Sequence, residues 1–228
     1  MSQPITVWSA PGGPNPFKVV IVCEELGLPY DFKVLPYAKL KSKPYTDINP
    51  NGRAPAIQDP NTGLTIWESG AILEYLVETY DKDNKIHYDS LEEKNQQRQY
   101  VFFQVSGQGP YFGQAAWFNV FHPNKIAEVQ ERYNKEVNRV VGVLDEILAQ
   151  SKSGWLVGDK CTYADLIFIP YNEAITGMIF AQYPGVFNID EYPHYKKWTA
   201  ALKERPAVKK GLELMAQVTA DAYAGKYQ

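Results

Sequence analysis

Two motifs decide the fold of this chain: Asn49-Pro50-Asn51-Gly52-Arg53-Ala54-Pro55-Ala56-Ile57 and, ten residues later, Trp67-Glu68-Ser69-Gly70-Ala71-Ile72. Pro55 directly precedes a short apolar stretch that is typical of a strand, and proline is tolerated at the first residue of a strand. A cis bond before Pro55 would fix the backbone of Ala54, exposed, at a turn. We predict that a second strand follows the turn at residues 59–63 and ends at Trp67.

A helix is predicted to begin directly after that second strand, at Glu68-Ser69-Gly70. Free N–H groups and the helix dipole at such a start favour an anion, and Glu68 adds a negative charge beside it. A site that offers both suits a small zwitterion, with an α-ammonium and an α-carboxylate. The alternative is a plain hairpin and a capped helix, but the Pro55 turn at this spacing favours the site. The apolar residues that follow lie on one helical face: Ile72, Leu73, Leu76, Val77 and Tyr80.

The residues before these motifs complete an α/β domain. We predict strands at residues 5–8 and 30–35, with a helix between them at residues 16–26 that Gly27 ends. Residues 39–47 are expected to form a loop or a short helix.

A charged stretch without apolar periodicity, residues 81–89, separates two kinds of sequence. Residues 1–82 are predicted to form the α/β domain, and residues 83–90 to form the linker. From residue 91 onward only helical periods occur, so residues 91–228 are predicted to form an all-α domain. The fold class is therefore α/β followed by all-α.

Composition narrows the class of protein. The chain has 228 residues, 45% of them hydrophobic, and a formal charge of −3 with Lys and Arg scattered along it, which argues against a nucleic-acid partner. We find no signal-peptide pattern and no apolar run long enough to cross a membrane, and we expect no membrane partner. Cys23 and Cys161 lie far apart and form no CxxC motif, which is typical of a reducing cytosol. The three histidines lack metal-ligand spacing, so we expect no metal.

Thr162-Tyr163-Ala164-Asp165 is a capping-box variant before a very apolar segment, with Asp in place of the Glu or Gln at the N3 position. Its expected role is in folding and not in chemistry. Loss of the Thr162 cap is expected to cost about 1–2 kcal/mol of stability.

The two opening motifs resemble those of the glutathione transferase superfamily, and the resemblance covers essentially the whole chain. It implies a thioredoxin-like N-terminal domain, in which Pro55 is the cis-proline, and an all-helical C-terminal domain, the cytosolic glutathione transferase fold. It also implies that Glu68 and Ser69 bind the γ-glutamyl end of glutathione, with Ala54 and Pro55 beside them. Glutathione is then the co-substrate.

The start of the first helix is where a thioredoxin-like domain holds a reactive sulfur. Cys23 falls two turns inside the helix, so a borrowed thiol, that of glutathione, fits better. Asn15 followed by Pro16 is a favoured N-cap arrangement. With Ser9-Ala10-Pro11 and Phe17-Lys18-Val19, it also resembles the fungal branch of the nitrogen-regulator prion protein and the bacterial nu class, where Asn donates its amide to the glutathione sulfur. Both roles are open, and any help from a hydroxyl would come from Ser9.

Further contacts to glutathione are implied by the same resemblance. Lys41 aligns with the position that often binds the glycyl end, although a solvated lysine is the alternative. Arg53 is included in the predicted site, where it braces its turn or pairs across domains. Residues 107–119 resemble the nu-type signature. Arg132 resembles an arginine that this branch lends toward the glutathione site, and an ordinary surface arginine is the alternative.

An electrophile pocket is expected on the helical domain. The Gly107-Gln108-Gly109-Pro110 segment is expected to kink its helix and open such a pocket. Aromatic side chains at this spacing are also common in a core, which is the alternative interpretation. The residues expected to flank the pocket are Tyr111, Phe112, Trp117 and Phe118.

This resemblance, together with the composition, implies a cytoplasmic, homodimeric glutathione transferase that lowers the pKa of the glutathione thiol and directs the thiolate at small electrophiles. One alternative keeps the site and changes the reaction to glutathione-dependent reduction of a disulfide or peroxide. Another is a regulator that binds a partner without catalysis.

Overall fold

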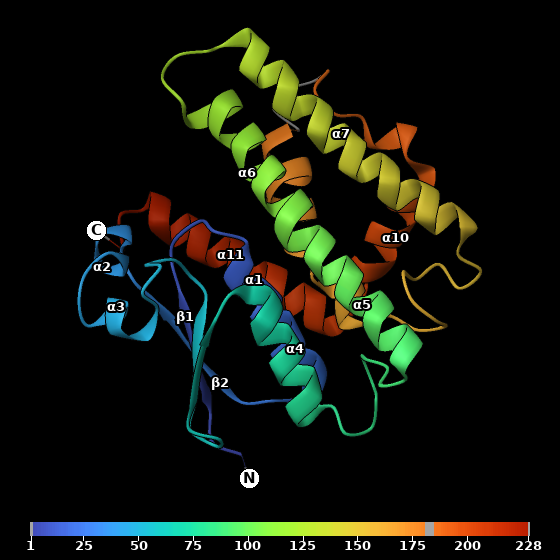
Figure 1. Ribbon diagram of the computed structural model, residues 1–228. Coiled ribbons are helices and arrows are strands. Elements are labelled where there is room, and N and C mark those ends of the chain that lie inside the picture. The colour runs from blue at the N-terminus through green and yellow to red at the C-terminus, as the bar shows by residue number, and fades with distance from the viewer. Residues whose placement is uncertain (1, 181–184, 228) are drawn as a thin grey trace. The chain divides into compact units, whose positions relative to one another are not determined.

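The computed structural model describes residues 2–180 and 185–227, and it divides into two compact units (Figure 1). One unit comprises residues 1–86 and 205–228, and the other comprises residues 87–204. The C-terminal segment thus belongs by its contacts to the unit of the sheet. The domain boundaries predicted from the sequence, 1–82 and 91–228, stay a prediction.

The first unit is built on a four-stranded sheet with the order β2-β1-β3-β4. The central pair, β1 and β3, is antiparallel, β2 runs parallel to β1, and β4 runs antiparallel to β3. The parallel pair requires a crossover, and the helix between the two strands supplies it. The strands are β1 (Ile5–Ser9), β2 (Tyr30–Val34), β3 (Ala56–Asp59) and β4 (Leu64–Trp67).

Three long helices accompany this sheet: α1 (Asn15–Leu26), α4 (Ser69–Tyr80) and α11 (Pro206–Tyr223). Both α4 and α11 contact α1, and Figure 1 shows α11 beside it. Gly211 allows the close approach of α11, because a Cβ there would lie 2.4 Å from Ile21 Cγ1. The segment expected as a loop or a short helix contains two short helices, α2 (Tyr37–Leu40) and α3 (Tyr45–Ile48).

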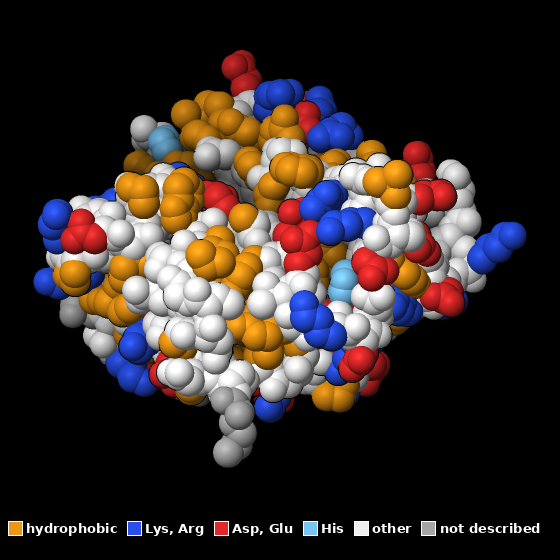
Figure 2. Space-filling model, turned by 60° about the horizontal axis from the view of Figure 1, so that its bottom comes forward, with side chains coloured by type: hydrophobic (Ala, Val, Ile, Leu, Met, Phe, Trp, Pro, Cys, Tyr) orange, Lys and Arg blue, Asp and Glu red, His pale blue; other side chains and the backbone are white. Residues whose placement is uncertain are grey.

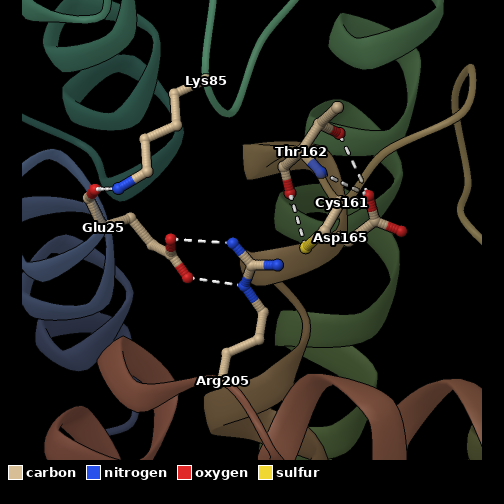
Figure 3. A network of polar contacts seen from close by, with 6 residues as sticks. All are labelled: Glu25, Lys85, Cys161, Thr162, Asp165 and Arg205. Atoms are coloured by element: carbon tan, nitrogen blue, oxygen red, sulfur yellow. Dashed lines mark hydrogen bonds and ion pairs between the residues drawn. The ribbon is translucent and has the colours of Figure 1, made fainter.

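A partly buried ion pair joins the residue before α11 to α1. Arg205, just before α11, donates from Nε to Glu25 Oε1 at 2.6 Å and from Nη2 to Glu25 Oε2 at 2.8 Å (Figure 3). Lys85 donates from Nζ to the carbonyl oxygen of Glu25. The two parallel bonds between guanidinium and carboxylate fix the orientation of both side chains.

The predicted end of α1 is correct, whereas its predicted N-cap is not. Gly27 adopts a left-handed conformation (φ 66°) after the last turn, which confirms the predicted stop. At the other end, Pro14 occupies the cap position and Asn15 is the first helical residue, so the prediction of Asn15 as the N-cap is wrong. The pyrrolidine ring holds Pro14 at φ −73°, already within the helical range, and the helix begins one residue earlier.

The second unit is helical: α5 (Leu91–Phe103), η1 (Gln104–Gln108), α6 (Gly109–Ala116), η2 (Trp117–Phe121), α7 (Ala127–Gln150), α8 (Tyr163–Leu166), α9 (Ile169–Tyr171), η3 (Asn172–Ile179), η5 (Ile189–Glu191) and α10 (Pro193–Lys203). Within 91–180 and 185–227 no residue forms a strand, which confirms the all-helical prediction. The turn at Gln104–Gln108 is π-helical, which is wider than an α-helical turn. Gly107 lies in this turn and Gly109 directly follows it, and the chain continues as helix α6.

The predicted capping box at the start of α8 is present. Asp165 accepts hydrogen bonds from the backbone N–H of Thr162 at 2.9 Å and from the Thr162 hydroxyl at 3.1 Å (Figure 3). The same carboxylate also accepts from the Leu156 N–H and from Trp198 Nε1, both at 2.9 Å. Asp165 therefore joins the cap to the preceding loop and to α10.

Candidate functional site

The register of the sheet places the end of β1, the start of β3 and the end of β4 next to one another, at one edge that runs across the strands. Ala56, the first residue of β3, pairs with Trp8 of β1 on one side and with Trp67 of β4 on the other. Ser9, Pro55 and Glu68 adjoin these partners along the chain. The edge thus gathers the segment that leads to α1, the proline turn and the start of α4.

The turn before Pro55 is held by side chains of its own neighbourhood. The carbonyl oxygen of Arg53 accepts hydrogen bonds from the Tyr45 hydroxyl and from Asn49 Nδ2, both at 2.6 Å. Asn49 also accepts from the N–H of Asn51 at 3.0 Å. The peptide bond between Ala54 and Pro55 is cis. Asn49 and Tyr45 are buried, so their hydrogen bonds hold the backbone of this turn in place.

Glu68 has an unusual backbone conformation. Its φ is 74° and its ψ is 115°, and the side chain is exposed. A residue other than glycine held at positive φ costs about 1–3 kcal/mol, and such residues cluster at functional sites. Ser69 follows as the first residue of α4 and is 6% exposed. The strained residue therefore presents a carboxylate next to a helix start that favours an anion.

Lys18 is a buried lysine at this place, for which the sequence predicted no role. It lies on α1 with 1% exposure, and its Nζ is 3.3 Å from Ser69 Oγ. Burial lowers the pKa of Lys18 well below its usual value, and the charge of Glu68 partly opposes this shift. Lys18 thus connects the first turns of α1 and α4. A lysine on an otherwise apolar helical face was the available signal.

The two residues predicted for the sulfur lie near the start of α1. Asn15 is half-buried and stands three residues before Lys18, so both lie on one side of the helix. Ser9 is completely buried, and its hydroxyl donates to the Ala10 carbonyl oxygen at 3.3 Å. The hydroxyl of Tyr37 donates to the Pro11 carbonyl oxygen. Tyr37 therefore connects α2 to the loop that leads to Asn15, a contact that the sequence did not predict.

Lys41 lies over the proline turn. It is exposed, and its Nζ donates to the Asn51 carbonyl oxygen at 3.1 Å. Gly52 (φ 60°) makes room for it, because a Cβ there would lie 2.7 Å from the Leu40 carbonyl oxygen and 2.9 Å from Lys41 Cδ. The exposed Arg53 follows in the same turn. Two cations thus flank the turn that leads to Pro55.

The remaining predicted residues belong to the helical unit. Arg132 on α7 lies 3.7 Å from Glu136, and its side chain is 66% exposed. Phe112 is completely buried in the core of this unit, whereas Trp117 is 48% exposed. Phe118 stacks on Tyr133 at 5.6 Å between ring centroids, and the Arg139 guanidinium lies 5.9 Å from the Tyr111 ring. Trp117, Tyr111 and Phe118 therefore retain some accessible surface, and Phe112 does not.

The described residues contain no group of three or more His, Cys, Asp or Glu side chains that could hold a metal ion. Among the same residues, no helix combines the length and the apolar character that a membrane span requires. Lys and Arg side chains are interspersed with Asp and Glu on the face shown in Figure 2.

Comparison with known proteins identifies relatives over nearly the whole chain. Residues 3–78 match the family described as glutathione S-transferase, N-terminal domain, and residues 114–213 match glutathione S-transferase, C-terminal domain. Glutathione S-transferase-like protein tpcF of Aspergillus fumigatus is 48% identical, over 92% of this chain and 95% of its own length. Transcriptional regulator URE2 of Saccharomyces cerevisiae is 36% identical, over 91% of this chain and 67% of its own length.

Among solved structures, the glutathione transferase URE2P6 from Phanerochaete chrysosporium, in complex with oxidised glutathione, is 44% identical. Its TM-score is 0.85, with 94% of this chain and 97% of that one covered. These similarities confirm the predicted fold, a thioredoxin-like sheet with its helices followed by an all-helical part.

Proposed function

This chain belongs to the glutathione S-transferase family, and from that premise we propose that it binds glutathione in the unit of the sheet and directs the thiolate at small electrophiles. One observation carries the proposal. The sheet register gathers a proline turn, a strained carboxylate and the starts of α1 and α4 at a single edge. These are the groups that a tripeptide with two carboxylates, one ammonium and one thiol requires.

The γ-glutamyl end of glutathione is assigned to the start of α4. Its α-carboxylate accepts from the Ser69 hydroxyl and the free N–H groups of the first turn, and its ammonium pairs with Glu68. The backbone of Ala54, before Pro55, is the proposed partner of the peptide part. The strain at Glu68 supports this assignment, because residues other than glycine that are held at positive φ cluster at functional sites.

The glycyl carboxylate is assigned to the cations beside the proline turn. Lys41 provides the charge, and Gly52 allows its path across the turn. Arg53 adds a second cation nearby. For Arg132, the proposal that it lends its charge to glutathione comes from the sequence resemblance.

Asn15 is the proposed partner of the sulfur. A free thiol has a pKa of about 8.5. A helix start contributes about 1 kcal/mol to the thiolate, and a hydrogen bond to a charged group contributes about 1.5–3 kcal/mol. Together these would bring the pKa of bound glutathione to about 6–7, which leaves most of it as thiolate at neutral pH. Ser9 is a weaker candidate, because its hydroxyl already donates to Ala10.

The electrophile is assigned to the helical unit. Tyr111, Trp117 and Phe118 offer aromatic surface there, whereas Phe112 is enclosed in the core. The thiolate attacks the electrophile directly, so the protein contributes positioning and a lowered thiol pKa, and no covalent enzyme intermediate forms.

A second candidate reaction uses the same glutathione site. The related URE2P6 structure is a complex with oxidised glutathione, which is a disulfide. A thiolate held by Asn15 is equally able to attack a disulfide or peroxide, so glutathione-dependent reduction is the alternative to conjugation. A cytoplasmic location and a homodimer stay predictions from the sequence.

The test is a comparison of rates with an aryl halide, an isothiocyanate and bis(2-hydroxyethyl) disulfide, each with glutathione. Conjugation predicts turnover of the first two, and reduction predicts turnover of the third. Glu68→Gln should raise the KM for glutathione in either case, whereas Glu78→Gln, an exposed carboxylate on the same helix, should not. Binding of glutathione without turnover of any of the three would contradict both reactions and favour a regulator, as the related URE2 is named.

A further inference from the structure

Lys18 lies where a charged side chain is costly. With 1% exposure its amine is almost wholly removed from water, and burial of an ammonium disfavours the charged form. A hydrophobic residue of similar size would avoid this cost. The groups that face Lys18 therefore indicate what this amine does.

Hydrogen-bond chemistry defines the contact with Ser69. Lys18 Nζ lies 3.3 Å from Ser69 Oγ, and both side chains are buried. The Lys18 amine donates this hydrogen bond, so the serine oxygen accepts it. A hydroxyl has a single proton, which must then be donated in another direction. Lys18 thus makes Ser69 a donor toward any group bound at the start of α4.

The position of Ser69 gives this polarity a consequence. It is the first residue of α4, where the helix dipole favours an anion. A carboxylate that accepts from the Ser69 hydroxyl completes a chain from amine to hydroxyl to carboxylate, and its negative charge favours the ammonium form of Lys18. Bonds in such a chain polarise one another and are stronger in a region of low dielectric.

We propose that Lys18 is a positioning residue of the glutathione site, which orients the Ser69 hydroxyl toward the γ-glutamyl carboxylate and holds a positive charge behind it. The inference rests on the function proposed above. Lys18 acts through Ser69 and does not take part in the reaction of the sulfur.

The experiment is a double-mutant cycle with Lys18→Met and Ser69→Ala. Calorimetry with S-methylglutathione measures the Kd without a contribution from thiol ionisation. We expect Lys18→Met to raise this Kd about tenfold, as for loss of a charge-assisted bond. The KM for glutathione should rise by a similar factor, while kcat at saturating glutathione changes less than about twofold. In the Ser69→Ala background, Lys18→Met should change the Kd less than about twofold.

Two controls separate this role from a purely structural one. Urea denaturation should show Lys18→Met to be at least as stable as the wild type, because methionine fills the site without a buried charge. Val22→Ala, which is also completely buried on α1, should lower stability and leave the Kd unchanged. Lys18→Gln keeps an N–H donor without the charge and should give an intermediate Kd; it serves as the test variant if Lys18→Met does not fold.

An unchanged Kd in Lys18→Met would overturn the role of Lys18 and leave the proposed function intact. The role would also be wrong if the effect of Lys18→Met persisted in full in the Ser69→Ala background. Failure of the wild type to bind S-methylglutathione would instead contradict the proposed function itself, and the inference with it.

Discussion

Lys18 and Asp165 are both buried ionisable side chains, one in each unit, and different groups surround them. Asp165 accepts hydrogen bonds from Leu156, Thr162 and Trp198, which belong to a loop, a helix cap and a packed helix of the same unit. Lys18 lies beside Ser69, next to the strained backbone of Glu68.

Burial disfavours the charged form of both side chains. It raises the pKa of Asp165, although hydrogen bonds to the carboxylate oppose the shift, and it lowers the pKa of Lys18. The partners distinguish the two. The hydrogen-bond donors to Asp165 stabilise the fold, whereas Ser69 and Glu68, which face Lys18, adjoin the proposed ligand site. The identity of the partners, and not burial itself, therefore indicates whether loss of a buried charge costs stability or binding.

The largest expected effect is on the structural side of this comparison. Asp165→Ala should lower the free energy of unfolding by about 3–5 kcal/mol, because several buried donors lose their acceptor at once. Urea denaturation followed by tryptophan fluorescence measures the change. Thr162→Ala, which removes only the cap, should cost about 1–2 kcal/mol. Equal costs for the two variants would show that Asp165 acts only within the capping box.

At the proposed glutathione site, replacement of Glu68 by Gly should change stability and affinity in opposite directions. Glycine relieves a strain of about 1–3 kcal/mol and costs about 0.5–1 kcal/mol in chain entropy, so stability should rise by about 1 kcal/mol. Affinity for glutathione should fall about tenfold or more, because the carboxylate is lost. Denaturation and calorimetry on one preparation give both numbers.

Asn84→Gly is the matched control, since Asn84 is also at positive φ (53°) but lies outside the proposed site. It should change stability by a few tenths of a kcal/mol, because asparagine tolerates this conformation, and leave affinity unchanged. Lower stability of Glu68→Gly than of the wild type would contradict the strain assigned to Glu68.

The smallest expected effect is a difference in pH dependence between two carboxylates. The folded-state pKa of Asp165 is raised above 3.8, so its contribution to stability is present below that pH and is lost as pH rises through the folded value. For Asp59, burial alone would raise the pKa, but hydrogen bonds from Tyr80 and Tyr75 outweigh it and hold the pKa below 3.8. Its contribution is present above that pH and is lost as pH falls through the folded value.

Urea titrations at several pH values should therefore give slopes of opposite sign. The stability difference between wild type and Asp165→Asn should shrink as pH rises, and that between wild type and Asp59→Asn should shrink as pH falls. Slopes of the same sign would contradict the direction of the folded-state pKa shift for one of the two carboxyl groups.

Local contacts are what the sequence predicted well. Thr162 and Asp165 are three residues apart, and their capping box follows from residue types and spacing alone. The bond from Trp198 to Asp165 joins distant segments, and no local pattern encodes it. The same holds for Lys18 and Ser69, which lie 51 residues apart and meet only once α1 and α4 are in place. The N-cap prediction for Asn15 was wrong because Pro14 is itself compatible with the first turn.

The most direct test of the glutathione site is the ultraviolet thiolate absorbance of bound glutathione as a function of pH, in the wild type and in Asn15→Ala. We predict a midpoint near pH 6–7 in the wild type, well below the free value of about 8.5, and a higher midpoint in the variant. Equal midpoints in the two proteins would contradict the role of Asn15 and leave the sulfur to backbone N–H groups or Ser9. A wild-type midpoint at the free value would contradict thiol activation at this site altogether.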